Sequence, residues 1–193
     1  MWQGRLSLAK KLVKADGFTL VEMMVALVVL SVLIVVSAPG FSDLIKNNRM
    51  LSQVYGMRAA LNGARSEALA QRSFVTLCRS SDGANCGGSW NQGYIAFIDA
   101  NGDGVVDDPN SPTGDQVFLA KVLDVDSLDI QYSKDPNDPV SGRVRFDSQG
   151  YARVFNGTFT VCDIRGANDA RGIIVTAAGI VRALDPNDPI TCI

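Results

Sequence analysis

An acidic stretch near the middle of the chain has the residue types of a calcium loop. Its candidate ligands are Asp99, Asn101, Asp103 and Asp107. The first three place side-chain oxygens at alternate positions, and Gly104 follows where such loops turn sharply. Carboxylate and amide oxygens are the donors that calcium prefers. The spacing therefore indicates a possible calcium site, and we expect no other cofactor.

The same stretch has a simpler interpretation. Asn110 stands at the twelfth position, where a calcium loop usually supplies a bidentate glutamate, and no second helix is expected after it. Asn-Gly and Asp-Gly are also favoured turn dipeptides, so a plain acidic hairpin loop explains these residues equally. We expect any calcium site here to be weak and of the extracellular type.

The chain contains four cysteines and no C-x-x-C pair. They are Cys78, Cys86, Cys162 and Cys192. An even number of cysteines in an exported domain predicts two structural disulfides formed in an oxidising compartment, not a redox site. The pairing 78–86 with 162–192 is one possibility. The pairings 78–162 with 86–192 and 78–192 with 86–162 remain open.

The chain contains no histidine, which argues against an enzyme. Without histidine there is no Ser-His-Asp or Cys-His arrangement and no imidazole metal site. The net charge is −2, and removing residues 1–17, with four basic residues and one acidic residue, makes it −5. A mildly acidic protein is not expected to bind polyanions in general, because phosphate binding depends on clustered cations.

At the N-terminus a basic leader precedes a long apolar run. Residues 18–38 form a run of 21 residues that only small hydroxyl residues and Glu22 interrupt. As a helix this run would extend roughly 31 Å, enough to cross a bilayer. The positive charge before it predicts a cytoplasmic N-terminus and an exported C-terminal part. Ser37-Ala38-Pro39 is a poor signal-peptidase site, and the composition changes instead at Gly17 and Phe18.

The stretch Gly17-Phe18-Thr19-Leu20-Val21-Glu22, followed by the apolar run, resembles the type III signal of type IV prepilins and pseudopilins. Pro39 stands where pilins often bend this helix. The resemblance implies that a prepilin peptidase cuts between Gly17 and Phe18 and methylates the new amine of Phe18. It also implies that Glu22 pairs with the N-terminal amine of a neighbouring subunit. From the residues alone, a carboxylate in a membrane helix indicates function by default, and a simple anchor is the alternative.

The rest of the chain predicts an α+β protein. Apolar residues at a 3-4-3-4 spacing indicate an amphipathic helix over residues 39–72; they are Val54, Met57, Leu61, Ala64 and Ala68, with Leu51 extending the face. Residues 73–193 read as an antiparallel β domain. Its expected strands are 73–79, 90–99, 116–123, 127–133, 142–146, 159–164, 171–176 and 180–184, with a turn over 147–150 that makes 142–146 a hairpin arm. We therefore predict a type IV pilin-like fold, a long helix with a transmembrane half and an amphipathic half packed on that domain.

Later motifs are similar to the GspH/FimT group of minor pilins and pseudopilins. They are Ala64-Arg65-Ser66-Glu67-Ala68, Trp90-x-x-Gly93-Tyr94-x-x-Phe97-x-Asp99 and Cys162-Asp163-x-Arg165-Gly166, the last fitting the FimT/FimU branch. The resemblance implies a minor pilin that acts at the pilus tip or in priming. Its partners would be other pilins, the prepilin peptidase and the inner-membrane assembly platform. The protein would cross the inner membrane once, with a periplasmic domain, until it enters the pilus. A type II secretion pseudopilin is the alternative.

A third alternative is a DNA-binding minor pilin for DNA uptake. Relatives implicated in uptake carry a G-R-x-R pattern in the C-terminal hairpin, whereas this chain has Gly179-Ile180-Val181-Arg182. Arg171 and Arg182 are the candidate DNA contacts. Solvated arginines that pair with neighbouring acids explain the same residues; those acids would be Asp147, Asp163 and Asp169.

Overall fold

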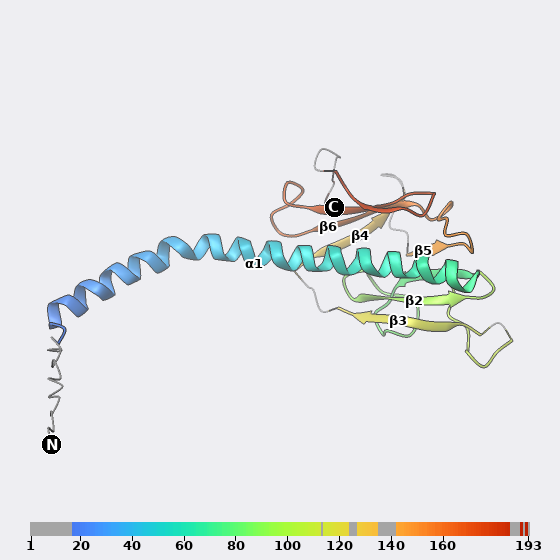
Figure 1. Cartoon of the computed structure of the whole chain (residues 1–193), viewed down its shortest axis with the longest axis horizontal. Coiled ribbons are helices and arrows are strands. Elements are labelled where there is room, and N and C mark those ends of the chain that lie inside the picture. Colours follow the sequence, from blue (N-terminus) through green and yellow to red (C-terminus); the bar gives the residue numbers. More distant parts are fainter. Residues whose placement is uncertain are drawn as a thin grey trace, which may run out of the picture. The chain divides into compact units, whose positions relative to one another are not determined.

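The computed structural model describes residues 17–112, 114–123, 127–134, 142–185, 190 and 192 (Figure 1). The chain divides into two units, Met1–Ile45 and Lys46–Ile193. Helix α1, Leu20–Gln71, begins in the first unit and ends in the second. The predicted leader, apart from Gly17, lies outside the described residues.

Helix α1 begins at a side-chain cap and ends at a left-handed residue. Thr19 Oγ1 accepts the backbone N–H of Glu22 at 3.2 Å, which satisfies one of the free donors of the first turn. At the other end Arg72 has a φ of 53°, a conformation that stops a helix. The helix therefore ends one residue before the predicted boundary at residue 72.

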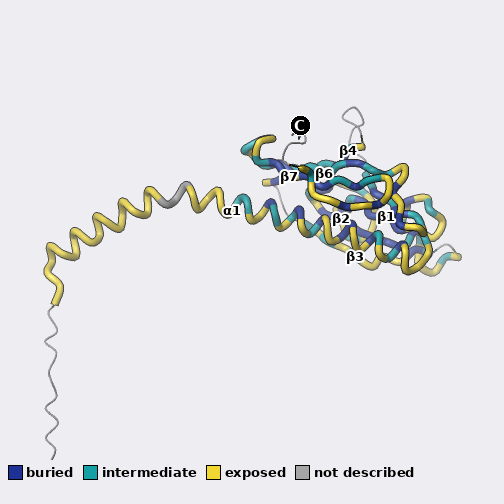
Figure 2. Tube along the Cα trace, turned by 45° about the horizontal axis from the view of Figure 1, so that its top comes forward, coloured by how far each residue is buried: buried dark blue, intermediate teal, exposed yellow. Residues whose placement is uncertain are grey.

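In the first unit, α1 exposes its side chains on all sides. Every residue from Leu20 to Val36 is exposed, as the yellow part of the tube shows (Figure 2). Within the described part of the chain, no single helix passes a length-and-composition test for a membrane span. Leu20–Val36 and Gly40–Gln71 pass that test together, as a pair separated by a bend.

The second unit contains two four-stranded antiparallel sheets. The first has the order β3-β2-β1-β5, and the second has the order β4-β6-β7-β8. The strands are β1 Phe74–Arg79, β2 Gly93–Asp99, β3 Gln116–Val122, β4 Asp129–Ser133, β5 Arg143–Phe146, β6 Gly157–Cys162, β7 Arg171–Val175 and β8 Val181–Ala183. All eight expected strands are present, and the predicted fold class is confirmed.

The strand that follows β5 belongs to the other sheet. A tight turn does form after β5, with the Gly150 N–H donating to the Asp147 carbonyl at 2.8 Å. The predicted hairpin is wrong, however, because β5 pairs with β1 and the next strand, β6, belongs to the other sheet. Burial explains the pairing: Val144 and Phe146 lie opposite Leu77 and Val75, and all four are fully buried.

The core forms where α1 runs between the two sheets (Figure 1). The buried face of the helix consists of Met50, Val54, Met57, Ala60, Leu61, Ala64 and Ala68. The predicted face is thus confirmed, except that Met50 is the buried residue at its start while Leu51 is half-buried. Trp90, which precedes β2, joins the two sheets: its ring lies edge-on to Phe159 of β6, with centroids 4.9 Å apart.

Candidate functional site

The expected processing site lies immediately before α1. Gly17, Phe18 and Thr19 are outside the helix, and the side chain of Phe18 is 79% exposed. The bond between Gly17 and Phe18 is therefore in an accessible, non-helical segment. A peptidase can bind such a segment without first unwinding a helix.

Glu22 lies in the first turn of α1. Its side chain is exposed and sits near the positive end of the helix dipole, where a carboxylate is favourable. Its backbone N–H donates to Thr19 Oγ1. Thr19 is therefore a site residue that the sequence analysis missed, although Thr-x-x-Glu before an apolar run is the pattern of a capping box.

The surface that follows Glu22 is apolar around the whole helix. Large apolar side chains between Leu20 and Val36 are exposed by 53–76%. The one hydroxyl among them is satisfied within the helix, because Ser31 Oγ donates to the Val28 carbonyl at 2.7 Å. A helix that is apolar on all sides is stabilised by lipid or by other apolar helices. This part of α1 therefore presents apolar side chains to its surroundings on every side.

In the second unit, the motif Trp90-x-x-Gly93-Tyr94-x-x-Phe97-x-Asp99 corresponds to tight packing around β2. Gly93 has a φ of 142°, and a Cβ atom there would overlap the Lys121 carbonyl oxygen on β3. Tyr94 and Phe97 are buried on opposite faces of β2, Tyr94 toward α1 and Phe97 in a smaller outer cluster with Cys78 and Ile95. The residues that carry the family resemblance therefore position the first sheet.

One disulfide closes the loop beside that outer cluster. Cys78 of β1 is bonded to Cys86. The carboxylate of Asp82 holds the loop between them, because it accepts the backbone N–H groups of Ala84 and Asn85, and the hydrogen bond from Asn85 lowers its pKa. A pocket of about 440 Å³ lies beside the disulfide.

The second disulfide, Cys162–Cys192, ties the C-terminal tail to the end of β6. Next to it, Arg165 makes a bidentate pair with Asp163, with Nη2 and Oδ2 2.7 Å apart. Arg165 Nη1 also donates to Asn47 Oδ1 on α1 at 2.9 Å. The hydrogen bond from Arg165 lowers the pKa of Asp163. This polar cluster joins the second sheet to the helix.

The four candidate calcium ligands lie in and beside the loop between β2 and β3. Asp99, the last residue of β2, is fully buried. Asn101 Nδ2 donates to Asp103 Oδ2 at 3.1 Å and to Asp107 Oδ2 at 3.0 Å, which brings these three side chains together. In the described ranges, no three Asp, Glu, His or Cys side chains are arranged around a common metal position.

The two candidate DNA contacts do not share a face. Arg182 lies opposite Ile174 in the pairing of β7 and β8, on the side of the sheet away from the core. Arg171 is the first residue of β7 and lies three residues before Ile174. Side chains alternate along a strand, so Arg171 and Ile174 lie on opposite faces of the sheet. Arg171 Nη1 donates to the carbonyls of Asp169 and Ala170. Two other arginines of the second unit pair with the acids named in the sequence analysis, Arg165 with Asp163 and Arg153 with Asp147.

Two family models match the sequence. "Type II transport protein GspH" matches residues 56–179, which is more than half of the chain, and "Prokaryotic N-terminal methylation motif" matches residues 13–38. The second match contains Gly17, Phe18 and Glu22. No curated protein matches the chain.

Two crystal structures of one minor pilin show the same fold. The type IV minor pilin FimU of Pseudomonas aeruginosa superimposes with a TM-score of 0.53 at 19% identity, over 75% of this chain and 95% of FimU. A second crystal form of FimU gives a TM-score of 0.52 at 18% identity, over 73% of this chain and 97% of FimU. The minor pseudopilin EpsH of Vibrio cholerae gives 0.45 at 12% identity, over 72% of this chain and 98% of EpsH. With the match over residues 56–179 and the methylation motif before it, the chain belongs to the GspH family of minor pilins and pseudopilins.

Proposed function

We propose that this protein is a minor subunit of a type IV pilus, cut between Gly17 and Phe18 and methylated on Phe18. One observation carries the proposal: the methylation motif over residues 13–38 is joined to the GspH region over residues 56–179 by the single helix α1. A processing signal, an apolar helix and an exported β domain in this order are the parts that a filament subunit needs.

The proposed mechanism is assembly, not catalysis. The exposed apolar part of α1 would hold the subunit in the inner membrane and then pack against the helices of other pilins. Glu22 would pair with the Phe18 amine of a neighbouring subunit, because an unpaired charge is costly among apolar helices. The second unit would be periplasmic before assembly and would form the surface of the pilus, at or near its tip, afterwards.

A second candidate is a pseudopilin of a type II secretion system. The name of the family, type II transport protein GspH, favours this candidate. The likeness to FimU extends to the fold alone. Deleting the gene separates the two candidates. Loss of surface pili with normal protein secretion indicates the pilus subunit, and loss of protein secretion with normal pili indicates the secretion pseudopilin. We do not extend the proposal to DNA uptake, since Arg171 and Arg182 lie on alternate sides of the strand pair.

The role of Glu22 is tested by a neutral variant of the same shape. Glu22→Gln should insert into the membrane and be processed normally, yet its amount in sheared pili should fall about tenfold or more, because removing one partner of a charge pair in an apolar setting costs several kcal/mol. Glu67→Gln removes the same charge from the same helix and serves as the control. Normal incorporation of Glu22→Gln would exclude the charge pair while leaving the processing proposal intact.

A further inference from the structure

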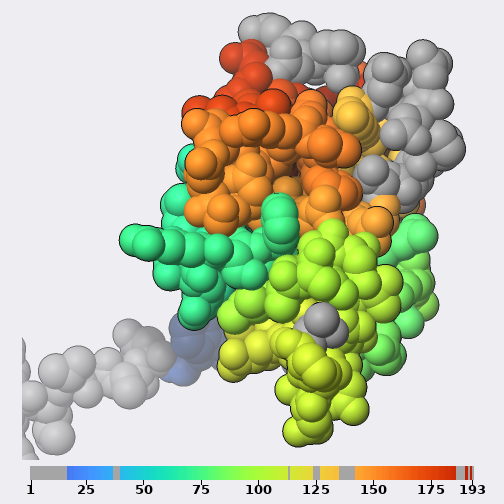
Figure 3. Space-filling view, turned by 90° about the vertical axis from the view of Figure 1, so that its right-hand side faces the viewer, coloured from blue at the N-terminus to red at the C-terminus, as the bar shows by residue number. Residues whose placement is uncertain are grey.

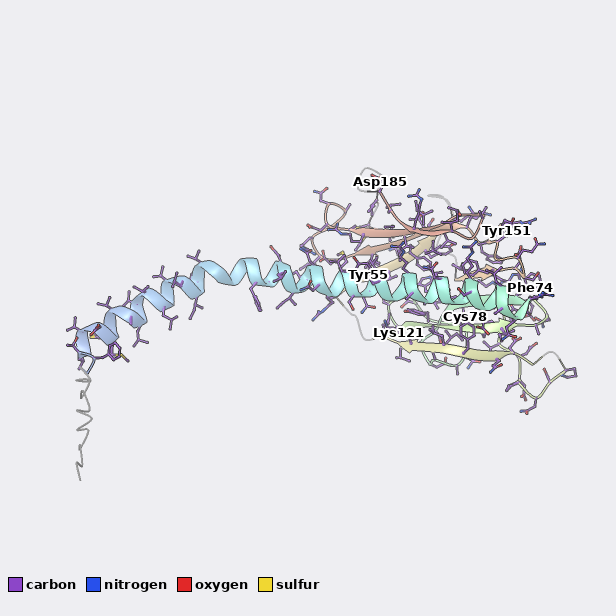
Figure 4. All side chains as sticks on the ribbon, viewed as in Figure 1. Tyr55, Phe74, Cys78, Lys121, Tyr151 and Asp185 are labelled. Atoms are coloured by element: carbon purple, nitrogen blue, oxygen red, sulfur yellow. A yellow bond between two sulfur atoms is a disulfide. The ribbon has the colours of Figure 1, made fainter. Side chains whose placement is uncertain are left out.

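We propose that the pocket beside the Cys78–Cys86 disulfide binds a small oxyanion, a phosphate or carboxylate group, between Arg79 and Arg143. The pocket has a volume of about 440 Å³, and all of its described lining belongs to the second unit. Cys78, labelled in Figure 4, lies in its wall. The inference is independent of the proposed function in the pilus, because it rests on residues of the β domain alone.

The described lining of the pocket carries positive charge and no acidic side chain. It consists of the disulfide, three glycines, Phe155, Arg79 and Arg143. Both arginines are half-buried. A guanidinium is charged at every physiological pH, and its planar fork of N–H groups matches the oxygens of a carboxylate or a phosphate. The lining therefore favours an anionic ligand.

Arg143 is held at the wall of the pocket by contacts on two sides. It lies opposite Cys78 in the pairing of β5 with β1. Its Nη1 donates to the Gly104 carbonyl at 3.2 Å, and its Cζ lies 6.0 Å from the centre of the Phe155 ring. A Cβ atom at Gly104 would lie 2.6 Å from Nη1, so the glycine leaves room for the guanidinium. Nη1 makes the described hydrogen bond of this group, and Nε and Nη2 keep N–H groups for a ligand.

Arg79 borders the pocket from the end of β1. Its backbone N–H donates to the Gly142 carbonyl at 3.1 Å, and its carbonyl accepts the Gly87 N–H at 2.8 Å. Its guanidinium lies against Gly142, where a Cβ atom would be 3.3 Å from Nε. Because Gly142 precedes Arg143 in the chain, the two arginines reach the pocket from neighbouring strands. Within the ranges that the structure describes, no acceptor receives a hydrogen bond from the Arg79 guanidinium. Its N–H donors can therefore bind a charged acceptor.

A third arginine adds to the local positive potential. Arg145 lies two residues after Arg143 on β5, so both are on the same face of the first sheet. The Arg145 Cζ lies 4.7 Å from the centre of the Phe155 ring. The loop between β2 and β3, seen as yellow-green atoms at the surface in Figure 3, contributes Gly104 to the wall. Without residues 1–17 the chain has a net charge of −5, so the positive potential is local to this region.

The size of the pocket indicates a small molecule rather than a bare ion. Pockets for small molecules occupy about 300–1,000 Å³, and this one falls in that range. The anionic group of the ligand would lie between the two guanidinium groups, and Phe155 would contact an apolar part. Phosphate and carboxylate groups share the paired oxygens that a guanidinium binds, so the two classes are separated by experiment.

Calorimetry on the processed full-length protein in detergent tests this site. Titration at neutral pH with sodium phosphate or with disodium succinate should give saturable heat for at least one of them, with a dissociation constant of about 0.1–1 mM, as expected for two charge-assisted hydrogen bonds. Sodium chloride at the same ionic strength should give none. Saturation by phosphate alone indicates a phosphate ester, and saturation by succinate alone indicates a carboxylate. Saturation by neither overturns the proposal.

Arg79→Gln is the variant that tests the pocket itself. It keeps a hydrogen-bond donor but removes the charge, so it should weaken binding of the anion about tenfold or more. Because the Arg79 side chain makes no hydrogen bond to a described residue, the Tm should stay within about 2 °C of wild type.

Arg182→Gln is the matched control, because it removes the same charge from an exposed residue of β8 in the other sheet. It should bind the anion within about twofold of wild type. Equal losses of affinity in Arg79→Gln and Arg182→Gln would show that the anion responds to overall charge and would overturn the proposal. Unchanged affinity in Arg79→Gln would overturn it as well.

Discussion

Arg65 Nε donates to the Gly150 carbonyl oxygen at 3.0 Å, across 85 residues of sequence. The same guanidinium donates through Nη2 to the Ala178 carbonyl at 3.3 Å. One helix side chain thus holds two turns, the turn after β5 and the turn between β7 and β8. It explains why an arginine stands in the Ala64–Ala68 motif, beside small residues that are buried against the sheets.

Replacing Arg65 should loosen both turns. Arg65→Ala leaves two carbonyls without their charged donor, so we expect the free energy of unfolding to fall by about 1–3 kcal/mol. Arg58→Ala, which removes an exposed arginine of the same helix, should change it by about 0.5 kcal/mol or less. Urea unfolding of the processed protein in detergent measures both. Equal stabilities of the two variants would show that the contacts of Arg65 contribute nothing.

Gly179 and Gly150 approach each other too closely to allow a side chain. Gly179 has a φ of 75°, and a Cβ atom there would overlap the Gly150 carbonyl oxygen. Gly179→Ala should therefore destabilise the protein by about 3 kcal/mol or more, from backbone strain and steric overlap together.

Gly166 provides the matched control for that substitution. Its φ is 83°, but a Cβ atom there would meet no other atom within 4 Å. Gly166→Ala should cost about 1 kcal/mol from the backbone conformation alone. Thermal unfolding of the two variants separates the cost of backbone strain from the cost of steric overlap. A Gly166→Ala variant as unstable as Gly179→Ala would contradict the steric explanation.

Asp163 makes the stability of the folded protein depend on pH in the acidic range. The hydrogen bond from Arg165 holds its pKa below the ordinary value of 3.8 in the folded protein. Because the pKa of Asp163 is lower in the folded state than in the unfolded state, the ionised carboxylate stabilises the fold. This stabilisation is complete at pH values above the unfolded-state pKa and is lost as the pH falls through the folded-state pKa. Stability should therefore decrease on acidification below the ordinary aspartate range.

Asp163→Asn should be less stable than wild type at pH 7, and its stability should fall less steeply in acid. Asp169→Asn is the control, because Asp169 is 43% exposed and its Oδ1 lies 3.6 Å from Arg165 Nη1. The measurement is Tm against pH for the three proteins. If the Tm of Asp163→Asn falls with decreasing pH as steeply as that of wild type, the pH dependence comes from other carboxylates.

The sequence predicts the local features of the fold because helices and strands produce periodic patterns of apolar residues. The spacing of Val54, Met57 and Leu61 marks the buried face of α1, and alternating residues with turn signals mark all eight strands. The Gly17–Phe18 boundary is likewise visible as a change in composition. These features depend on residues that are neighbours in the chain.

Contacts between residues far apart in the sequence produce no periodic pattern. That β5 pairs with β1 follows from the burial of Val144 and Phe146 opposite Leu77 and Val75, which no local pattern reveals. The bonds of Arg65 to the two turns, and the buried Oδ1 of Asp99, depend in the same way on tertiary packing. In contrast, the cap at Thr19 depends on a local pattern, Thr-x-x-Glu before an apolar run, which the sequence alone contains.

The most direct test of the account is the intact mass of the protein from membranes of cells with and without prepilin peptidase. With the peptidase, we expect the mass of residues 18–193 plus one methyl group, with the methyl group on Phe18. Without it, we expect residues 1–17 to remain attached. A chain that is uncut at Gly17 in both strains, or cut after Ala38 instead, would contradict the proposal that this protein is a filament subunit.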